Sequence, residues 1–204
     1  RSWAQEDKGD VVKAGITMQA VGLLPNAYPM NETDTNEGGW KASALRENMN
    51  EASGEINQLF TDLLPYVAKV EKLSKNVSGV DVSAETVSTI TNDQLWIMSY
   101  SELCGKKYSS IPNLGNEGST YEYWKNVGTL FPGGSNEALK KIGVGTTSVS
   151  NWWERSVFIG GSGFYCVDLN GKPVQGWNSN INIVRVAPCF CFGTSYEEPP
   201  EYWI

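Results

Sequence analysis

The stretch from Ser150 to Phe192, SNWWERSVFIGGSGFYCVDLNGKPVQGWNSNINIVRVAPCFCF, decides the fold of this chain. Short runs rich in aromatic and β-branched residues alternate there with glycine, asparagine and proline, a pattern typical of antiparallel strands joined by turns. We expect strands over residues 156–159, 163–169, 173–177 and 180–192, with a break at Pro188. Asn170-Gly171 is a hairpin signal, because both central positions of a type I′ turn need positive φ. The C-terminal half is therefore predicted to be an antiparallel sheet.

The N-terminal half carries a helical pattern. Apolar residues recur at steps of three and four from Leu45 to Leu63, which is an amphipathic stripe. Ser53-Gly54 interrupts this stripe, so we predict two helices, over residues 41–50 and 53–64. Ser99 and Glu102 form a capping-box signature that opens a short helix ending at Gly105.

Extended segments are expected around these helices. They comprise an opening strand over 11–24, a meander over 67–92 and a buried strand over 95–98. A further helix is expected over 137–142. The fold class is therefore α+β.

The chain has 204 residues, which fits one domain with insertions. Residues 10–105 hold the N-terminal strand and helices, and residues 106–147 read as an insertion whose aromatic residues pack back on the domain. Those aromatic residues are Tyr121, Tyr123 and Trp124. Residues 148–193 hold the sheet and the candidate ligand-binding segment, and residues 194–204 are expected to be an irregular tail.

Composition excludes several kinds of partner. The net charge of -7 opposes binding to nucleic acid or to an anionic membrane, because both need a basic surface. No run approaches the ~18 apolar residues that a membrane-spanning helix needs. The N-terminal RSWAQEDKGD lacks an initiator methionine and the apolar core of a signal peptide, so we expect a fragment or a processed product.

The chain contains no histidine, which excludes catalytic triads, histidine metal sites and imidazole acid-base chemistry. Glu102, Glu154 and Asp168 are candidate carboxylates, but nothing pairs them at a catalytic separation and we expect each to be solvated. We therefore predict no catalytic residue, no metal site and no cofactor. The glycine-rich segment 160–163 lacks the features of a phosphate loop and is expected to be a flexible hairpin tip.

The four cysteines, Cys104, Cys166, Cys189 and Cys191, form no C-x-x-C pair. Cys189 and Cys191 are two residues apart, so on a strand they face the same side and are poorly placed to bond each other. We favour buried free thiols over disulfides, and the alternative stays open.

Three blocks of the chain resemble, in the same order, the signature of an uncharacterised bacterial and phage domain family. The first is Gly38-Gly39-Trp40 with Ser43 and Arg46, and the second is Leu95 to Ser99 with Glu102 and Gly105. The third comprises Trp152 to Ser156, Val167 to Gly171 and Val184 to Pro188. Glu154 and Val157 depart from the family's usual WWLRSP pattern, and Ile183 and the additional Val186 depart from its GVRPAF strand.

This family is identified as a member of the C-type-lectin fold. The same scaffold carries the variable proteins of diversity-generating retroelements and the formylglycine-generating enzymes. The resemblance implies structural roles for Arg155 and Arg185, and we expect the same of Trp152 and Trp153, at least one of which should lie in the core. The calcium motif of sugar-binding lectins is missing, and no oxidase active-site pattern surrounds Cys189 and Cys191.

Positions between the signature residues form the candidate ligand-binding surface, because they combine aromatic anchors with adaptable polar side chains. They are Glu154, Val157, Phe158, Ile159, Ser162, Phe164, Trp177, Asn178, Asn180 and Asn182. Retroelement mutagenesis targets adenines, so asparagine codons are its usual substrates, although asparagine is also common in turns.

The leading hypothesis is a non-enzymatic protein that binds a protein or glycan receptor on another cell surface. It would be displayed on a virion or a bacterial surface, and a narrower form of this hypothesis makes it the variable protein of a diversity-generating retroelement. One alternative is a structural domain of a larger surface or virion protein, and another is an oxidase related to formylglycine-generating enzymes. Homo-oligomerisation is left open.

Overall fold

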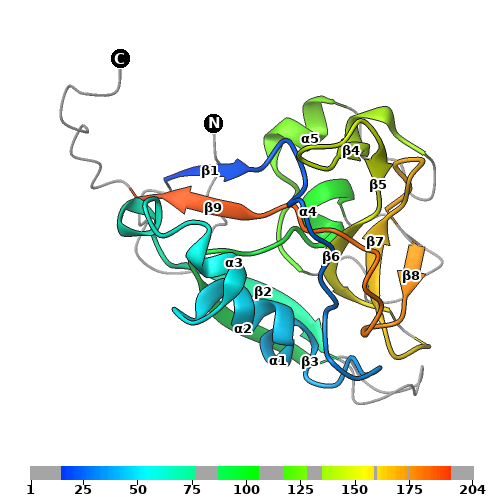
Figure 1. Cartoon of the computed structure of the whole chain (residues 1–204), viewed down its shortest axis with the longest axis horizontal. Helices are drawn as coiled ribbons and strands as arrows, with labels where there is room; N and C mark the ends of the chain where they lie inside the picture. The colour runs from blue at the N-terminus through cyan, green and yellow to red at the C-terminus, as the bar shows by residue number, and fades with distance from the viewer. Residues whose placement is uncertain are drawn as a thin grey trace.

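A computed structural model describes residues 15–76, 87–105, 117–127, 135–158, 160–173 and 175–193. Within these residues, short helices lie beside small antiparallel sheets, and the elements share one hydrophobic core (Figure 1). This arrangement confirms the α+β class. The expected tail over 194–204 lies outside the described residues, as do the first four residues of the expected opening strand and residues 77–86 of the expected meander.

The first and last described strands pair with each other. β1 (Ile16–Gln19) runs antiparallel to β9 (Cys189–Phe192), with Ile16 opposite Phe192. Cys189 and Cys191 are buried while Phe190 and Phe192 are only partly buried, so the two cysteines face the same side as expected. The pairing brings the two ends of the domain to the same edge (Figure 1). The predicted strand 180–192 is therefore confined to its last four residues.

β2 (Val70–Asn76) and β3 (Val87–Asp93) form the longest antiparallel ladder among the described residues, and Val70 lies opposite Asp93. Lys72 and Ser74 on β2 point inward and are buried. The segment 95–98 is buried too, but the prediction of a strand there is wrong. Among the described residues its one β-bridge is isolated, between Trp96 and Cys189.

The two predicted helices are shorter and more broken than the stripe suggests. The first is split into α1 (Gly39–Ala42) and α2 (Ala44–Asn50). Ser43 separates them, because it is extended at ψ 139° and its hydroxyl accepts the Arg46 N–H to begin α2. The second is a single turn, α3 (Glu55–Gln58), followed by turns and the 3₁₀ helix η1 (Leu64–Tyr66), which contains a proline.

α4 (Tyr100–Cys104) confirms the capping-box prediction. The Ser99 hydroxyl accepts the Glu102 N–H at 3.2 Å, and a Glu102 carboxylate oxygen accepts the Ser99 N–H at 3.1 Å. Gly105 ends the helix at φ 80°. All five residues of α4 are buried, so this short helix lies inside the molecule.

The insertion contributes α5 (Glu122–Asn126), η2 (Glu137–Leu139) and β4 (Lys141–Ile142), and β4 pairs with β5 (Val149–Ser150), which follows the insertion. The predicted helix 137–142 is therefore one 3₁₀ turn and a short strand. Trp124 is buried and Tyr121 packs against the core, but Tyr123 is 62% exposed, so the packing prediction is wrong for Tyr123.

β6 (Trp152–Val157), β7 (Phe164–Val167) and β8 (Gln175–Trp177) form a three-stranded antiparallel sheet in that order. β6 begins four residues earlier than predicted, and its register shifts between Trp153 and Val157. The β7–β8 connection is longer than a two-residue hairpin. Its turn runs from Asp168 to Gly171, which has φ 75°, and the Asp168 carboxylate accepts the N–H groups of Asn170 and Lys172.

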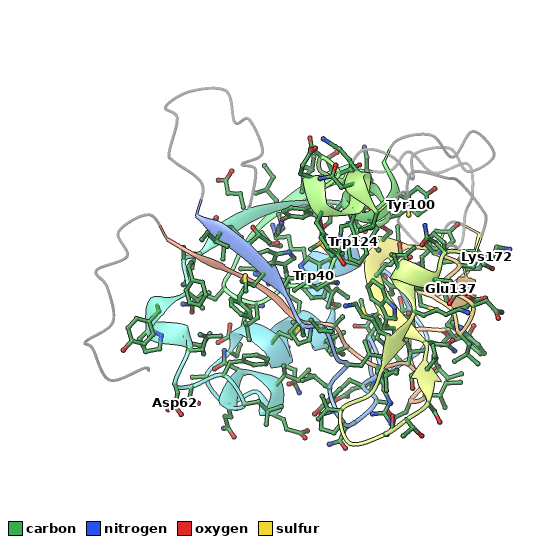
Figure 2. The ribbon with its side chains drawn as sticks, turned by 90° about the horizontal axis from the view of Figure 1, so that it is seen from above. Trp40, Asp62, Tyr100, Trp124, Glu137 and Lys172 are labelled. Atoms are coloured by element: carbon green, nitrogen blue, oxygen red, sulfur yellow. The ribbon has the colours of Figure 1, made fainter. Side chains whose placement is uncertain are left out.

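Four tryptophans form the centre of the core. Trp40, Trp96, Trp152 and Trp153 are all 0% exposed. Three of them use their indole N–H: Trp40 donates to Asp93, Trp152 to the Leu139 carbonyl and Trp153 to the Tyr28 carbonyl. Trp40, Tyr100 and Trp124 lie within the body of the molecule in Figure 2, whereas Asp62 and Glu137 lie toward its periphery. Both tryptophans of the pair are therefore core residues.

Candidate ligand-binding surface

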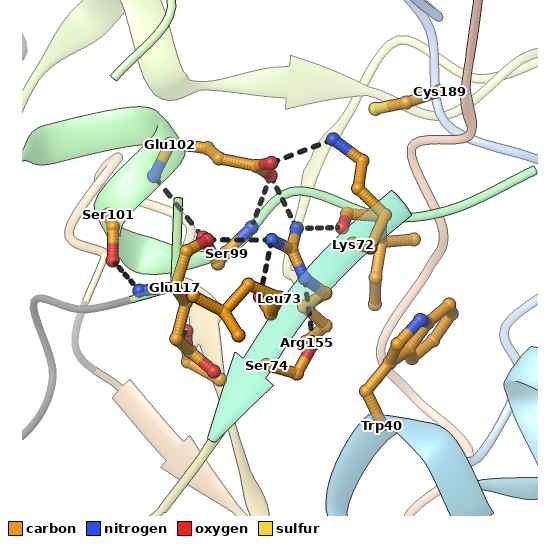
Figure 3. Close-up of polar contacts among 12 residues, drawn as sticks. Trp40, Lys72, Leu73, Ser74, Ser99, Ser101, Glu102, Glu117, Arg155 and Cys189 are labelled. Carbon is orange, nitrogen blue, oxygen red and sulfur yellow. Dashed lines mark hydrogen bonds and ion pairs between the residues drawn. The ribbon is translucent and has the colours of Figure 1, made fainter. Parts of the chain in front are cut away.

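Arg155 of β6 organises a buried polar cluster with residues of β2 and α4 (Figure 3). Its Nη1 donates to Glu102 and to the Ile97 carbonyl at 2.9 Å, and its Nη2 donates to the carbonyls of Leu73 at 3.1 Å and Glu117 at 2.8 Å. Nε donates to the Ser74 hydroxyl at 3.1 Å. Because Arg155 is 0% exposed, its five donors join β2, α4 and β6 from inside, which confirms its structural role.

Lys72 completes the charge balance of this cluster. Its Nζ donates to Glu102 at 2.8 Å and to the Tyr121 hydroxyl at 2.9 Å, and it lies 4.3 Å from the centroid of the Trp96 ring. Burial raises the pKa of Glu102, but the charges of Arg155 and Lys72 outweigh that effect and hold this pKa below its ordinary value. Glu102 is thus a buried carboxylate between two cations, and the expectation that it is solvated is wrong.

Glu117 and Ser156 extend the cluster. The Ser156 hydroxyl donates to one carboxyl oxygen of Glu117, and the Lys75 N–H donates to the other at 2.8 Å. Burial raises the pKa of Glu117, against the lowering effect of Arg155. Every charged member of the cluster is at least 97% buried, so the cluster holds the scaffold together and cannot touch a ligand.

Two predictions about Glu154, the neighbour of Arg155 on β6, are wrong. It was expected to be solvated and to bind ligand, yet it is 0% exposed. Neither of its carboxyl oxygens has a hydrogen-bond partner in the described part of the chain. Burial, followed by the charge of Glu117, raises its pKa well above the ordinary value. Both predictions fail because β6 is buried on both faces.

Two other predicted surface residues are also core residues. Val157 is 2% exposed and Phe164 is 0% exposed, because they lie opposite each other in the β6–β7 ladder that faces the hydrophobic core. Phe158 is partly buried, and its ring packs edge to face against the Tyr165 ring, with 5.3 Å between the ring centroids. Its ring covers Gly176, where an added Cβ would lie 2.8 Å from it. Ile159 lies outside the described residues.

The glycine-rich connection from β6 to β7 is tied down. The Asn36 side-chain amide donates to the carbonyls of Phe158, Gly161 and Gly163, at 3.0 to 3.2 Å. Ser162 is partly exposed within this connection. The predicted hairpin tip is therefore present, but Asn36 fixes its backbone.

The predicted surface residues that are exposed lie on the segment that follows β8. Asn178, Asn180 and Asn182 are exposed, and Trp177 is partly exposed. Between them, Ser179 is 0% exposed and anchors the segment. Its carbonyl accepts the N–H groups of Met30 and Asn31, at 2.8 and 3.0 Å, and its N–H donates to Asp34 at 3.1 Å.

The Ser179 hydroxyl also donates to the Ser162 carbonyl, which joins this segment to the β6–β7 connection. The sequence missed this anchor because a serine between asparagines looks like one more polar loop residue. The residues that remain candidates for ligand contact are Phe158, Ser162, Trp177, Asn178, Asn180 and Asn182.

A shallow open depression adjoins the same segment, and its lining was not predicted from sequence. It is lined by Pro25, Asn26, Ala27, Tyr28, Pro29, Glu55 and Asn182. The Tyr28 hydroxyl donates to Glu55 at 3.0 Å. Of these residues only Asn182 belongs to the surface predicted from the sequence, and it links the depression to that surface.

The cysteines behave as apolar core residues. All four are free and buried, which confirms the preferred interpretation. Burial raises the pKa of Cys189 to about 12, so this thiol is protonated at neutral pH and is a poor nucleophile. Among the described residues, no three acidic or cysteine side chains are grouped so as to hold a metal ion. No helix in the described ranges is long and apolar enough to cross a bilayer.

A known family matches most of the sequence. Residues 12–192 match a family described as a domain of unknown function (DUF6273), which is most of the 204-residue chain. The chain belongs to the DUF6273 family. Neither the curated proteins nor the solved structures provide a match. The DUF6273 match ends at Phe192, the last residue of β9, so the family's unit includes the strand pair β1–β9 and everything between its strands.

Proposed function

We propose that this DUF6273 domain is a non-enzymatic binding module of C-type-lectin fold, displayed on a phage particle or a bacterial surface. The observation that carries the proposal is the contrast around Ser179. Its buried side chain and backbone fix the segment, while Asn178, Asn180 and Asn182 on either side are exposed. A rigid backbone that presents amide side chains suits recognition, because little conformational entropy is lost on binding.

The path of the chain supports the fold and display parts of the proposal. The resembled signature residues Trp40, Trp153 and Arg155 meet in one core, as a shared scaffold requires. Because β1 and β9 pair, both ends of the domain leave from one edge, and β8 lies on the other side of the molecule (Figure 1). A display protein attached at that edge would leave the segment after β8 free to meet a receptor.

The contact surface that we propose is smaller than the sequence pattern suggested. Asn178, Asn180 and Asn182 supply exposed hydrogen-bonding groups, with Ser162 and the partly exposed Trp177 beside them. This mixture of amides and an aromatic edge fits a protein or glycan receptor. Glu154, Val157 and Phe164 are no longer part of the proposal.

A narrower form of the proposal makes the domain the variable protein of a diversity-generating retroelement. Asparagine codons are the usual targets of such mutagenesis, and the exposed asparagines alternate with buried or partly buried residues. Sequencing the genomic neighbourhood tests this. A reverse-transcriptase gene and a template repeat that differs at the codons for these asparagines would support it. Their absence would remove diversification and leave the binding proposal standing.

The binding proposal is tested with a triple variant, Asn178→Ala, Asn180→Ala and Asn182→Ala. A matched control replaces three exposed amides elsewhere, Gln58, Asn92 and Asn126, by alanine. Binding of the fluorescently labelled proteins to a panel of bacterial cells is measured by flow cytometry. Their binding to receptor and glycan arrays is measured by surface fluorescence. We expect the first variant to lose binding and the control to keep it.

Both triple variants should stay folded, because exposed substitutions cost at most about 0.5 kcal/mol each. Their melting temperatures should fall by less than roughly 6 °C. Binding that is unchanged in the asparagine variant would contradict the proposal, as would unfolding of that variant. Absence of binding by the wild-type protein on every surface would favour the structural-domain alternative.

A further inference from the structure

The depression beside Asn182 is preformed. The segment that makes its wall is held by backbone hydrogen bonds: Leu24 N–H donates to Val186 at 2.9 Å, Tyr28 N–H to Val184 at 3.1 Å and Met30 N–H to Ser179 at 2.8 Å. Pro25 and Pro29, both lining residues, have φ fixed by their rings. A ligand would therefore meet a surface that needs little ordering.

A carboxylate is positioned inside this depression. Glu55 begins α3, and its Oε1 accepts the Tyr28 hydroxyl at 3.0 Å. Tyr28 is 8% exposed, so a buried ring holds the carboxylate in place. Burial, and then the hydrogen bond to Glu55, raise the pKa of Tyr28, so it stays a donor to Glu55 at neutral pH. The hydroxyl uses one of the carboxylate's two oxygens.

The other polar groups in the lining are neutral amides. Asn26 and Asn182 are exposed and can offer carbonyl oxygens as acceptors. Among the described residues, no lysine or arginine lines the depression. The adjacent Arg185 directs Nη1 to the carbonyls of Leu24, at 3.0 Å, and Pro25. Nothing in the lining therefore neutralises Glu55.

We propose that this depression binds a basic side chain, an arginine guanidinium in the first place, presented by a protein partner. The carboxylate and two amide carbonyls match the several N–H donors of a guanidinium, and the proline rings offer apolar surface to its methylene stem. The net charge of -7 would favour the approach of a basic partner. The inference rests on the proposed binding function, whose partner class it narrows to proteins.

The probe is the peptide acetyl-Gly-Arg-Gly-amide, titrated into isotopically labelled protein and followed by backbone amide chemical shifts. The matched probe carries citrulline, which keeps the shape of arginine without its charge. We expect saturable shifts at Ala27, Tyr28, Glu55 and Asn182 with the arginine peptide. Affinity for the citrulline peptide should be lower by about fivefold, the upper value for an ion pair at an exposed carboxylate such as Glu55.

The protein variant is Glu55→Gln, which keeps an acceptor for the Tyr28 hydroxyl and so should preserve the fold. Glu137→Gln is the control, because the Glu137 side chain is 84% exposed and the same charge is removed. Glu55→Gln should weaken arginine-peptide binding about fivefold, and Glu137→Gln less than twofold. Equal losses in the two variants would show general charge attraction only and would overturn the inference, as would shifts located elsewhere or no saturation.

This result is separable from that of the binding proposal. If the asparagine variant loses receptor binding while Glu55→Gln leaves peptide binding unchanged, the basic-side-chain inference fails alone. If the peptide binds as expected but the asparagine variant retains receptor binding, the asparagine surface is the part that is wrong.

Discussion

Replacing Glu154 by leucine should stabilise the domain, although it removes an ionisable residue from β6. Glu154 is 0% exposed and its carboxyl oxygens have no hydrogen-bond partner among the described residues. The resembled family usually carries leucine at this position. A carboxyl group there must either stay protonated or place an unpaired charge in the core, and both are costly.

The gain has two parts. With Glu154 protonated, leucine removes an unsatisfied hydroxyl donor and an unsatisfied carbonyl acceptor, which is worth about 1–3 kcal/mol. The pKa of Glu154 is raised in the folded state, so the folded protein binds its proton more tightly than the unfolded chain. The stability from that protonation is complete below the ordinary value of 4.5 and is lost as the pH rises toward the folded pKa. Over that interval the advantage of leucine should widen by about 1.4 kcal/mol per pH unit.

Urea unfolding of the wild type, Glu154→Leu and Glu154→Gln at several pH values from 4.5 to 8.5 measures this difference. Glu154→Gln should remove the pH dependence of Glu154 while it keeps the unsatisfied polar group. Glu47→Gln, at an exposed position on α2, is the control and should follow the wild type. The raised pKa of Glu117 adds a slope of the same sign to every variant and cancels in the comparison.

The reasoning is refuted if Glu154→Leu is less stable than the wild type throughout this range. It is also refuted if the difference between the two proteins does not change with pH, because Glu154 would then have the same pKa in the folded and unfolded states.

Three other predictions concern the scaffold. Trp153→Ala, Arg155→Ala and Arg185→Ala should each lower the unfolding free energy by about 2–4 kcal/mol, and unchanged melting temperatures in all three would contradict their structural roles. Glu102→Gln should cost about 3–5 kcal/mol at pH 7, because it leaves buried cations unpaired. Since the pKa of Glu102 is lowered, its contribution is lost as the pH falls below 4.5, and the difference from the wild type should shrink there in acid-unfolding curves. The four thiols should react with Ellman's reagent at the rate of global unfolding, and fast reaction of any one in native protein would show that it is accessible.

The sequence predicted an element correctly where the interactions that form it lie within a few residues of one another. The Ser99–Glu102 capping box gave α4 with its end at Gly105, because both hydrogen bonds are made within four residues. The amphipathic stripe did not reveal the break at Ser43, which depends on a cap that competes with helix continuation. The segment 95–98 has strand composition but makes an isolated bridge, because burial alone does not supply a pairing partner.

The candidate site shows the same division. Composition predicted that the residues between the signature positions face solvent, but burial of β6 on both faces places Glu154 and Val157 in the core. That outcome depends on elements far away in sequence, such as α4. The exposed asparagines were correctly placed on the surface, since turn-forming residues need no partner to remain exposed. The Glu55 carboxylate was missed because Tyr28 reaches it across 27 positions of sequence.

The pairing of β1 with β9 also has a mechanical consequence. Ile16 lies opposite Phe192, so a force that separates the two ends of the domain would load the ladder from one end. Its hydrogen bonds would then break one after another, as in a zipper, instead of sharing the load as in a sheared ladder. A domain held at both ends between moving bodies would open at low force, whereas one carried at the tip of a host protein, or inserted in a host loop, would not be loaded. This strand order therefore suits a domain that carries no load better than a domain that transmits force between two attachment points.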